Sequence, residues 1–282
     1  MIEINQLVKS FGKQPVLKID EFIIQPGDRI ALIGANGAGK TTLIRSILGQ
    51  YQAKGTITVF GKNPRKSRVP ILDRIGFVPQ HSPPLQMSVR ELINFTVEIS
   101  PKSEQKEIEK IAVALGMDIR ENEKKPFVKL SGGMQQKMLI SLALAKKPDL
   151  LIMDEPAANL DPIGRKAFFH ELGKLAQDTT MLLSSHRVDE VLSLINRIVE
   201  MDLGKIVVDE KIGTTRIAHD LLPCSIELLD ENQAATRALQ DWGFKPINGE
   251  TYYEGSIAGA DRLRFINSIS HFANAISKLK IN

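Results

Sequence analysis

Residues 34–42 carry the feature that most restricts this chain, the sequence Gly-Ala-Asn-Gly-Ala-Gly-Lys-Thr-Thr. It matches G-x-x-x-x-G-K-[ST], the P-loop pattern that binds phosphate groups. Glycine lets the backbone turn tightly, so that successive N–H groups converge on phosphate oxygens. In such a loop Lys40 supplies positive charge to the outer phosphates, and the hydroxyl of Thr41 is suited to Mg²⁺. The pattern therefore predicts a site for a nucleotide and its metal ion.

The flanking residues agree with a P-loop. Residues 29–33 are a short apolar run that predicts a strand, and residues 43–48 predict a helix that ends at Gly49. A helix that begins in the loop presents the positive end of its dipole to the same anion. A glycine-rich turn without a ligand is the alternative, and the motifs further along the chain argue against it.

Composition limits the classes of protein that this chain can belong to. The formal net charge of the 282 residues is +4, which suits an anionic ligand or an anionic membrane surface but is too small to indicate nucleic acid. Cys224 is the single cysteine, so no intrachain disulfide forms and a reducing compartment is expected. The first residues do not resemble a signal peptide, and no run of about 18 apolar residues predicts a membrane-spanning helix.

The order of predicted elements indicates an α/β chain with a helical insertion. Strands are expected near residues 2–8, 16–24, 55–60 and 74–78. A block of helices follows over residues 81–147, in which Ser88 and Glu91 form a capping box. The α/β pattern then resumes and continues to a hairpin that ends near residue 208.

Residues 209–282 contain no further motif but retain the patterns of a folded chain. A strand is expected over residues 224–229, a helix over 232–242, one or two strands over 247–257 and an amphipathic helix over 260–279. We therefore expect a small α+β appendage. Its role can be regulatory, a brace between subunits, a docking site or only a stabilising extension.

Two carboxylates follow a predicted buried strand at residues 150–153. In a P-loop enzyme the first of them, Asp154, is placed to hold Mg²⁺ through its water shell. The second, Glu155, is placed to orient or deprotonate the attacking water. The alternative is that Asp154-Glu155-Pro156 only caps a helix.

Residues 130–136, Leu-Ser-Gly-Gly-Met-Gln-Gln, predict a second anion-binding end. A serine hydroxyl, bare backbone N–H groups and the helix dipole are combined at one helix N-terminus. Two separate phosphate-binding ends in one chain indicate that one of them serves a neighbouring molecule. An ordinary serine cap is the alternative if this motif is taken alone.

Six motifs in order now define a resemblance: the P-loop, Gln80 after a strand, Leu-Ser-Gly-Gly, Asp154-Glu155-Pro156, Asn159-Leu160-Asp161 and His186 after another strand. The chain resembles the ATP-binding cassette (ABC) ATPases, and most closely the single-cassette ATP-binding subunits of ABC transporters of the exporter-like type. The resemblance covers residues 1–208. It implies an α/β P-loop NTPase core with a mixed sheet, an antiparallel β subdomain and an inserted helical subdomain at about 81–147, followed by the appendage at 209–282.

The resemblance also implies roles for individual residues. The nucleotide-binding residues are then Phe11, which stacks on adenine, and Gly34, Asn36, Gly37, Gly39, Lys40, Thr41, Thr42 and Gln80. The metal residues are Thr41, Gln80 and Asp154. The catalytic residues are Glu155 as general base and His186 at the γ-phosphate. The residues that meet a partner cassette or its ATP are Ser131, Gly132, Gly133, Gln135 and Asp161.

One position departs from the family pattern, because Met134 stands where the signature usually has glutamine and Gln135 follows it. The cofactors implied are ATP and Mg²⁺. The partners implied are a second cassette, expected as a homodimer, and transmembrane permease subunits, with no nucleic acid, at the cytoplasmic face of the cell membrane. Two alternatives stay open: a soluble ABC ATPase that acts on nucleic acid or ribosomes, and a nucleotide-binding module that does not hydrolyse ATP.

Overall fold

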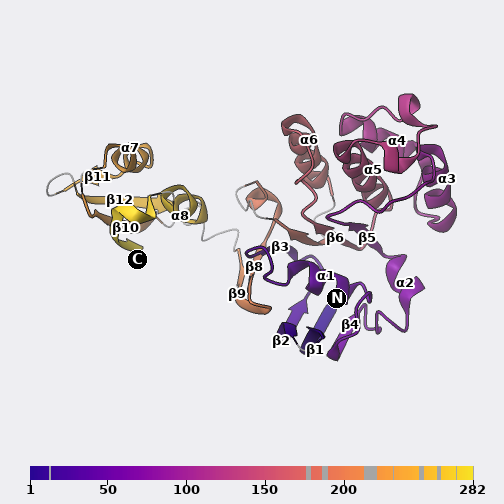
Figure 1. Ribbon diagram of the computed structural model, residues 1–282, viewed down its shortest axis with the longest axis horizontal. Helices are drawn as coiled ribbons and strands as arrows, with labels where there is room; N and C mark the ends of the chain where they lie inside the picture. Colours follow the sequence, from indigo (N-terminus) through magenta and orange to yellow (C-terminus); the bar gives the residue numbers. More distant parts are fainter. Residues whose placement is uncertain are drawn as a thin grey trace. The chain divides into compact units, whose positions relative to one another are not determined.

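The computed structural model describes residues 1–12, 14–175, 179–185, 190–212, 221–230, 232–247, 251–258, 262–270 and 272–281. The chain forms two compact units, Met1–Lys211 and Ile212–Asn282 (Figure 1). No helix among these residues is both long and apolar enough to cross a membrane.

A six-stranded sheet forms the centre of the first unit, in the order β5-β6-β7-β3-β8-β9. Its strands are β3 (Arg29–Ile33), β5 (Ile75–Val78), β6 (Leu150–Asp154), β7 (Thr180–Ser184), β8 (Arg197–Asp202) and β9 (Lys205–Lys211). Pairing is parallel from β5 to β8, and β9 pairs antiparallel with β8. Every residue of β6 and β7 is buried, which explains their continuous apolar sequences. The mixed sheet predicted from the sequence is confirmed.

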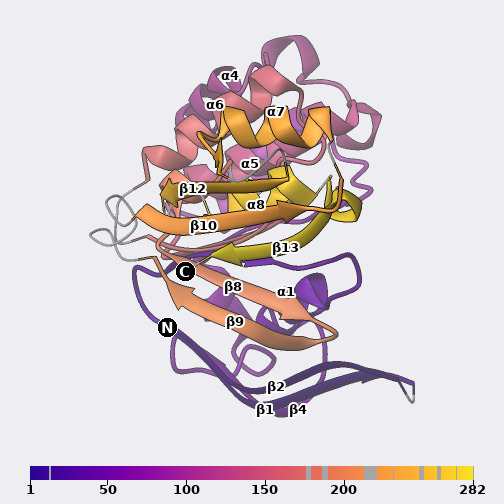
Figure 2. The same cartoon turned by 90° about the vertical axis from the view of Figure 1, so that its left-hand side faces the viewer.

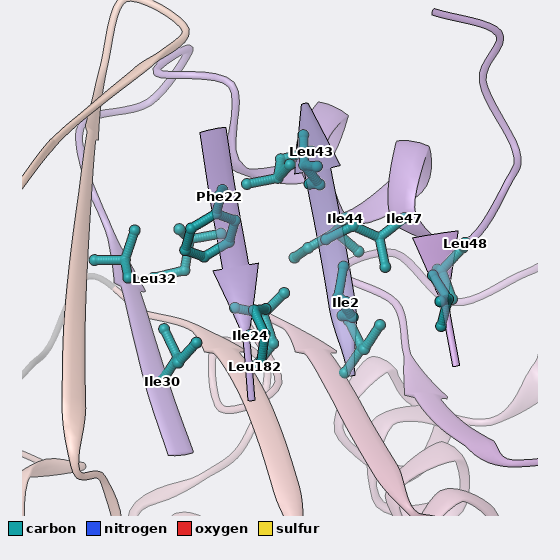
Figure 3. Close-up of a cluster of buried hydrophobic side chains, with 14 of the residues drawn as sticks. Ile2, Phe22, Ile24, Ile30, Leu32, Leu43, Ile44, Ile47, Leu48 and Leu182 are labelled. Atoms are coloured by element: carbon teal, nitrogen blue, oxygen red, sulfur yellow. The ribbon is translucent and has the colours of Figure 1, made fainter. Parts of the chain in front are cut away.

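A second, antiparallel sheet has the order β2-β1-β4. It contains β1 (Ile2–Phe11), β2 (Gln14–Ile24) and β4 (Lys54–Val59), which lie side by side in Figure 2. Helix α1 (Lys40–Ile47) follows β3 and buries one face against residues of both sheets. Figure 3 shows Leu43, Ile44 and Ile47 of α1 near Ile2, Phe22 and Leu32. Residues of both sheets and of α1 thus form one hydrophobic core, which fixes the start of α1 after the P-loop.

The helical insertion lies in the sequence between β5 and β6. Its helices are α3 (Val89–Ile99), α4 (Gln105–Ala114) and α5 (Gly132–Ala145), with short 3₁₀ turns at Arg120–Asn122 and Phe127–Lys129. The predicted capping box at α3 is present, because Glu91 N–H donates to Ser88 Oγ and Ser88 N–H donates to Glu91 Oε2.

The remaining helices of the first unit are α2 (Arg68–Leu72), α6 (Pro162–Gly173) and a 3₁₀ turn at Leu192–Leu194. Asp161 caps α6, and Pro162 occupies its first turn as the sequence predicted.

The second unit is a four-stranded antiparallel sheet in the order β11-β12-β10-β13. Its elements are β10 (Leu221–Leu228), α7 (Gln233–Asp241), β11 (Lys245–Pro246), β12 (Tyr252–Ala258), α8 (Arg262–Ser270), a 3₁₀ turn (Ala273–Ala275) and β13 (Ile276–Ile281). This βαββαβ order is that of the ferredoxin-like fold. Figure 2 shows β12, β10 and β13 side by side.

The helix predicted over residues 260–279 is wrong in its second half. Helix α8 ends at Ser270, and the chain continues into the strand β13. In β13 Leu279 pairs with Ile226 and Ile281 pairs with Cys224, and Ile276 and Ile281 pack against the core of this unit. A short apolar-polar alternation after a helical pattern is easily taken for more helix, and only the pairing with β10 distinguishes the two.

Candidate functional site

The P-loop occupies the turn between β3 and α1, and its glycines are required by space and backbone conformation. Gly34 has φ +142°, and a Cβ there would lie 2.2 Å from the carbonyl oxygen of Met201. Gly39 has φ +105°, and a Cβ there would lie 2.8 Å from Leu17 Cδ2. A side chain at Gly34 would collide with the backbone of β8. One at Gly39 would displace the Leu17 side chain and strain the backbone, so glycine suits both positions.

Lys40 is the first residue of α1 and is 6% exposed. Its Nζ donates to the carbonyl oxygens of Gly34 at 2.6 Å and Ala35 at 3.1 Å, so the ammonium group lies within the loop. Burial lowers the pKa of Lys40, and the nearby carboxylates of Glu155 and Asp154 partly offset this effect. The loop thus holds a desolvated positive charge, which is the group that an entering phosphate would pair with.

Asp154 ends β6 and is 2% exposed. The Ser184 hydroxyl, at the end of β7, donates to Asp154 Oδ1 at 2.7 Å and accepts from Glu155 N–H at 2.9 Å. One hydroxyl therefore orients the backbone and the side chain of the two predicted carboxylate residues.

The sequence did not single out Ser184 for this role. The sequence indicates only that Ser184 lies at the end of a predicted strand. The position becomes informative once β7 is known to lie beside β6, because Ser184 is then the residue paired with Asp154.

Glu155 follows the strand with φ +49°, a left-handed conformation that is uncommon outside glycine. Its Oε2 accepts a hydrogen bond from Gln80 Nε2 at 3.1 Å. Gln80 follows β5, the strand beside β6, so the parallel sheet brings both side chains to one edge. The strained backbone at Glu155 lies where the chain leaves the sheet, at the position predicted for the general base.

A cavity of about 210 Å³ collects most of the predicted nucleotide residues. It is lined by Val16, Asn36, Gly37, Ala38, Gly39, Lys40, Thr41, Thr42, Gln80 and Glu155. The structure thus brings the P-loop, Gln80 and the predicted base Glu155 together from three separate stretches of sequence.

Phe11, predicted to stack on adenine, is not among the residues that line this cavity. Phe11 is 47% exposed at the end of β1 and makes an edge contact with Tyr51, with 5.3 Å between ring centroids. Lys9 Nζ lies 4.5 Å from the centre of the Phe11 ring. His186 lies outside the described residues, so its predicted role at the γ-phosphate stays a prediction.

The Leu-Ser-Gly-Gly segment starts α5, with exposed Ser131 and Gly132 at the helix N-terminus. Ser131 Oγ accepts from Met134 N–H at 3.3 Å, which is an ordinary serine cap. The Gln135 amide donates to the carbonyl oxygens of Phe127, Val128 and Leu130 and so braces the segment before the helix. Ser131, Gly132 and Gly133 are not among the residues that line the P-loop cavity.

Asp161 is the N-cap of α6, where its Oδ1 accepts from Gly164 N–H at 2.5 Å. Its Oδ2 lies 3.5 Å from Lys137 Nζ of α5. The backbone N–H of Gly164, assisted by Lys137, lowers the pKa of Asp161, which is therefore a carboxylate near neutral pH.

The fold and this cavity together define a P-loop nucleotide-binding protein with a helical insertion. A family model described as "ABC transporter" matches residues 17–158. Nod factor export ATP-binding protein I of Rhizobium meliloti (strain 1021) is 35% identical over 228 residues, which are 75% of this chain and 67% of that protein. The bacitracin transport ATP-binding protein BcrA of Bacillus licheniformis is 32% identical over 263 residues, 91% of this chain and 84% of that protein.

Solved structures show the same fold. The ATP-binding subunit of an ABC transporter superimposes with a TM-score of 0.65 at 25% identity, covering 75% of this chain and 90% of that one. A dimeric ATP-binding cassette in a post-hydrolysis state with ADP and Pi gives a TM-score of 0.66 at 21% identity, covering 76% of this chain and 99% of that one.

The chain belongs to the ABC transporter family and is an ATP-binding cassette subunit. The predicted family, the α/β cassette fold and the ATPase class are confirmed. The names of the relatives favour an ATPase that powers a transporter over the alternative that acts on nucleic acid or ribosomes.

Proposed function

We propose that two copies of this chain pack head to tail, with ATP and Mg²⁺ between the P-loop of one and Ser131–Gly133 of the other. One observation carries this proposal: the chain has both phosphate-binding helix ends, yet only the P-loop end lines the nucleotide cavity. A helix N-terminus that is exposed and capped only by serine is available to a second molecule. ATP shared by both surfaces would hold the pair together, and hydrolysis would remove the shared contact.

Within each site, we assign the chemistry to the residues at the edge of the sheet. Lys40 neutralises the outer phosphates, and Glu155 accepts a proton from the attacking water or orients it. The Gln80 amide donates to Glu155 Oε2 and so orients the carboxylate. Ser184 maintains the positions of Asp154 and of the Glu155 backbone during this step.

The residues at this site suit Mg²⁺. Thr41 and Gln80 line the cavity and offer hydroxyl and amide oxygens, and the Asp154 carboxylate ends β6 directly before Glu155, which also lines it. Hard oxygen donors of this kind are those that Mg²⁺ prefers, usually together with phosphate oxygens and water. When bound, the ion would neutralise charge on the β- and γ-phosphates.

We also propose a membrane-spanning partner chain and a position on the inner face of the cell membrane. Relatives of this chain are named as ATP-binding proteins of Nod factor export and bacitracin transport, and they support a role in transport. The unit Met1–Lys211 would bind and hydrolyse the ATP that drives transport. The alignment with the bacitracin transport protein covers 91% of the chain and so extends into the C-terminal unit, which supports a role for that unit in transport as well.

Replacement of Glu155 by Gln tests the core of this proposal. The change keeps the shape and the hydrogen-bonding reach of the side chain but removes its basicity. Turnover should fall by ~100- to 10,000-fold while ATP binding persists. The variant should accumulate as an ATP-bound dimer, measured by light scattering with and without nucleotide.

The matched control is Glu104→Gln, the same chemical change at an exposed position before α4. This control should hydrolyse ATP at the parent rate and should not accumulate as a dimer. Undiminished hydrolysis by Glu155→Gln would remove Glu155 as the base. A persistent monomer with bound ATP would contradict the head-to-tail dimer.

The membrane partner has its own test. Tagged Glu155→Gln protein with ATP, isolated from native membranes, should carry a polytopic membrane protein that mass spectrometry identifies. Recovery of ribosomes or DNA-repair proteins without such a chain would overturn the transport proposal.

A further inference from the structure

The N-terminal part of α5 packs closely against the segment that leads from Glu155 to α6. Gly133 is half-buried, and a Cβ there would lie 3.0 Å from the carbonyl oxygen of Asn159. Gln136 and Lys137 follow three and four residues later, so they share the same face of the helix. The Leu-Ser-Gly-Gly segment at the start of α5 is the signature of the family, and Asn159-Leu160-Asp161 is its D-loop. We call their contact the signature–D-loop junction, formed by Gly133 and Lys137 on one side and Asn159 and Asp161 on the other.

Lys137 occupies the centre of the junction. Its side chain is 11% exposed, and its Nζ lies 3.5 Å from Asp161 Oδ2. A Cβ on Gly164 would lie 2.8 Å from Lys137 Cε, and one on Gly116 would lie 3.6 Å from Lys137 Nζ. The lysine stem is thus confined between the first turn of α6 and the glycine that follows α4.

Stability alone does not explain this arrangement. Burying an ammonium group costs free energy. Attraction to Asp161, whose side chain is 59% exposed, offsets only part of this desolvation cost. Beside Lys137, the Gln136 side chain is fully buried, and neither amide atom has a hydrogen-bond partner among the described residues. Departures of this kind from good packing are expected where a site serves function.

We propose that Lys137 is a positioning residue that fixes the D-loop to the signature helix through Asp161. The inference rests on the proposed function, since both elements are there assigned to the surface that meets a second cassette. With Asp161 held by Lys137, Ser131–Gly133 and the D-loop keep one spacing, so a partner cassette meets a single preformed surface. Without the pair, each part must be ordered separately when the dimer forms, which weakens association.

The test uses the full chain carrying Glu155→Gln, in which ATP-dependent dimerisation is measured by analytical ultracentrifugation. Lys137→Met keeps the buried stem and removes the charge, and it should weaken dimerisation by ~10-fold. Binding of a fluorescent ATP analogue to the dilute monomer should not change, because the P-loop is outside the junction. Lys137→Arg should recover most of the lost association, since it keeps the charge.

Asp161→Asn is the second variant, and it carries the test if Lys137→Met does not fold. Asparagine still accepts from Gly164 N–H and only the charge is lost, so dimerisation should weaken to a similar extent. Combined with Lys137→Met it should add little, because both remove the same pair. Lys110→Met is the matched control, since Lys110 forms an exposed ion pair with Glu107 on α4, and it should dimerise as the parent does.

Parent-like dimerisation of Lys137→Met or Asp161→Asn would overturn the inference. So would a double variant in which the fold-losses of dimerisation of the two single variants multiply. A merely structural role is also distinguishable, because it would lower the melting temperature and leave dimerisation of the folded protein unchanged. If the Glu155→Gln parent does not dimerise with ATP, the proposed function itself fails and the inference falls with it.

Discussion

The two helices α1 and α5 begin at anion-binding sequences of the same general kind, but their N-termini are built differently. The cap of α1 is Gly39 in a left-handed conformation with no side-chain hydrogen bond, and Ala38, Gly39 and Lys40 at this end are buried. The cap of α5 is Ser131, which satisfies Met134 N–H, and the first residues there are exposed.

The charges near the two ends differ as well. Lys40, Asp154 and Glu155 lie close together at α1, where they alter the pKa of Lys40. At α5 the charged pair Lys137–Asp161 lies behind the helix end, in its contact with the D-loop. In the head-to-tail dimer that we propose, one chain supplies the P-loop, Lys40 and the carboxylates of a site. The α5 end is an exposed surface that would act on nucleotide held by the partner.

The largest expected difference between the two helix ends comes from replacing one glycine in each motif by alanine. Gly34→Ala places a Cβ against the Met201 carbonyl and strains a left-handed backbone, so we expect a loss of ~3 kcal/mol or more in stability or no ATP binding. At Gly132 a Cβ meets nothing within 4 Å, and alanine favours the helix. Gly132→Ala should therefore fold and bind ATP as a monomer, and lose only dimerisation.

Thermal unfolding, nucleotide titration and ultracentrifugation of the two variants check this expectation. Normal ATP binding by Gly34→Ala would show that the loop tolerates a side chain. An unfolded Gly132→Ala would show that the α5 end is as constrained as the α1 end.

Ser184→Ala tests whether the carboxylates at the α1 side depend on one hydroxyl. It leaves Asp154 Oδ1 and Glu155 N–H without this partner, so the free energy of unfolding should fall by ~1–3 kcal/mol. The turnover number should fall by about tenfold, equivalent to ~1.4 kcal/mol in the barrier. Steady-state ATPase assays and urea unfolding measure both effects.

Ser100→Ala is the matched control for Ser184. Ser100 is also buried, but its hydroxyl has no hydrogen-bond partner in the part of the chain that the structure describes. Its replacement should leave turnover unchanged. Equal effects of the two substitutions would mean that the Ser184 bonds do not position the site.

Gln135→Ala gives the smallest expected effect, on the α5 side. It removes the donors that brace three carbonyl groups before the helix, so the free energy of unfolding should fall by ~1 kcal/mol. Gln105→Ala, which loses one side-chain bond to Glu109 on α4, should cost less and serves as the control. An unchanged urea midpoint for Gln135→Ala would show that the brace contributes nothing.

The catalytic half could be predicted from the sequence because its chemistry lies in short contiguous motifs. Gly34 to Thr42 specify their own loop, and an apolar run before Asp154 identifies a strand that ends at the site. The helix over residues 260–279 was mispredicted for the opposite reason, since Ile276–Ile281 becomes a strand only through pairing with β10.

The sequence alone determined the family, the order of the main elements up to residue 208 and the identity of the charged groups, because local spacing is sufficient for each of them. Tertiary structure decided which groups act on one another. Ser184 reaches Asp154 only because β7 lies beside β6, Gln80 reaches Glu155 only because β5 lies beside β6, and Lys137 reaches Asp161 only because Gly133 lets α5 approach the D-loop. Strand order and close backbone approach join residues that are distant in sequence, and no local pattern encodes such contacts.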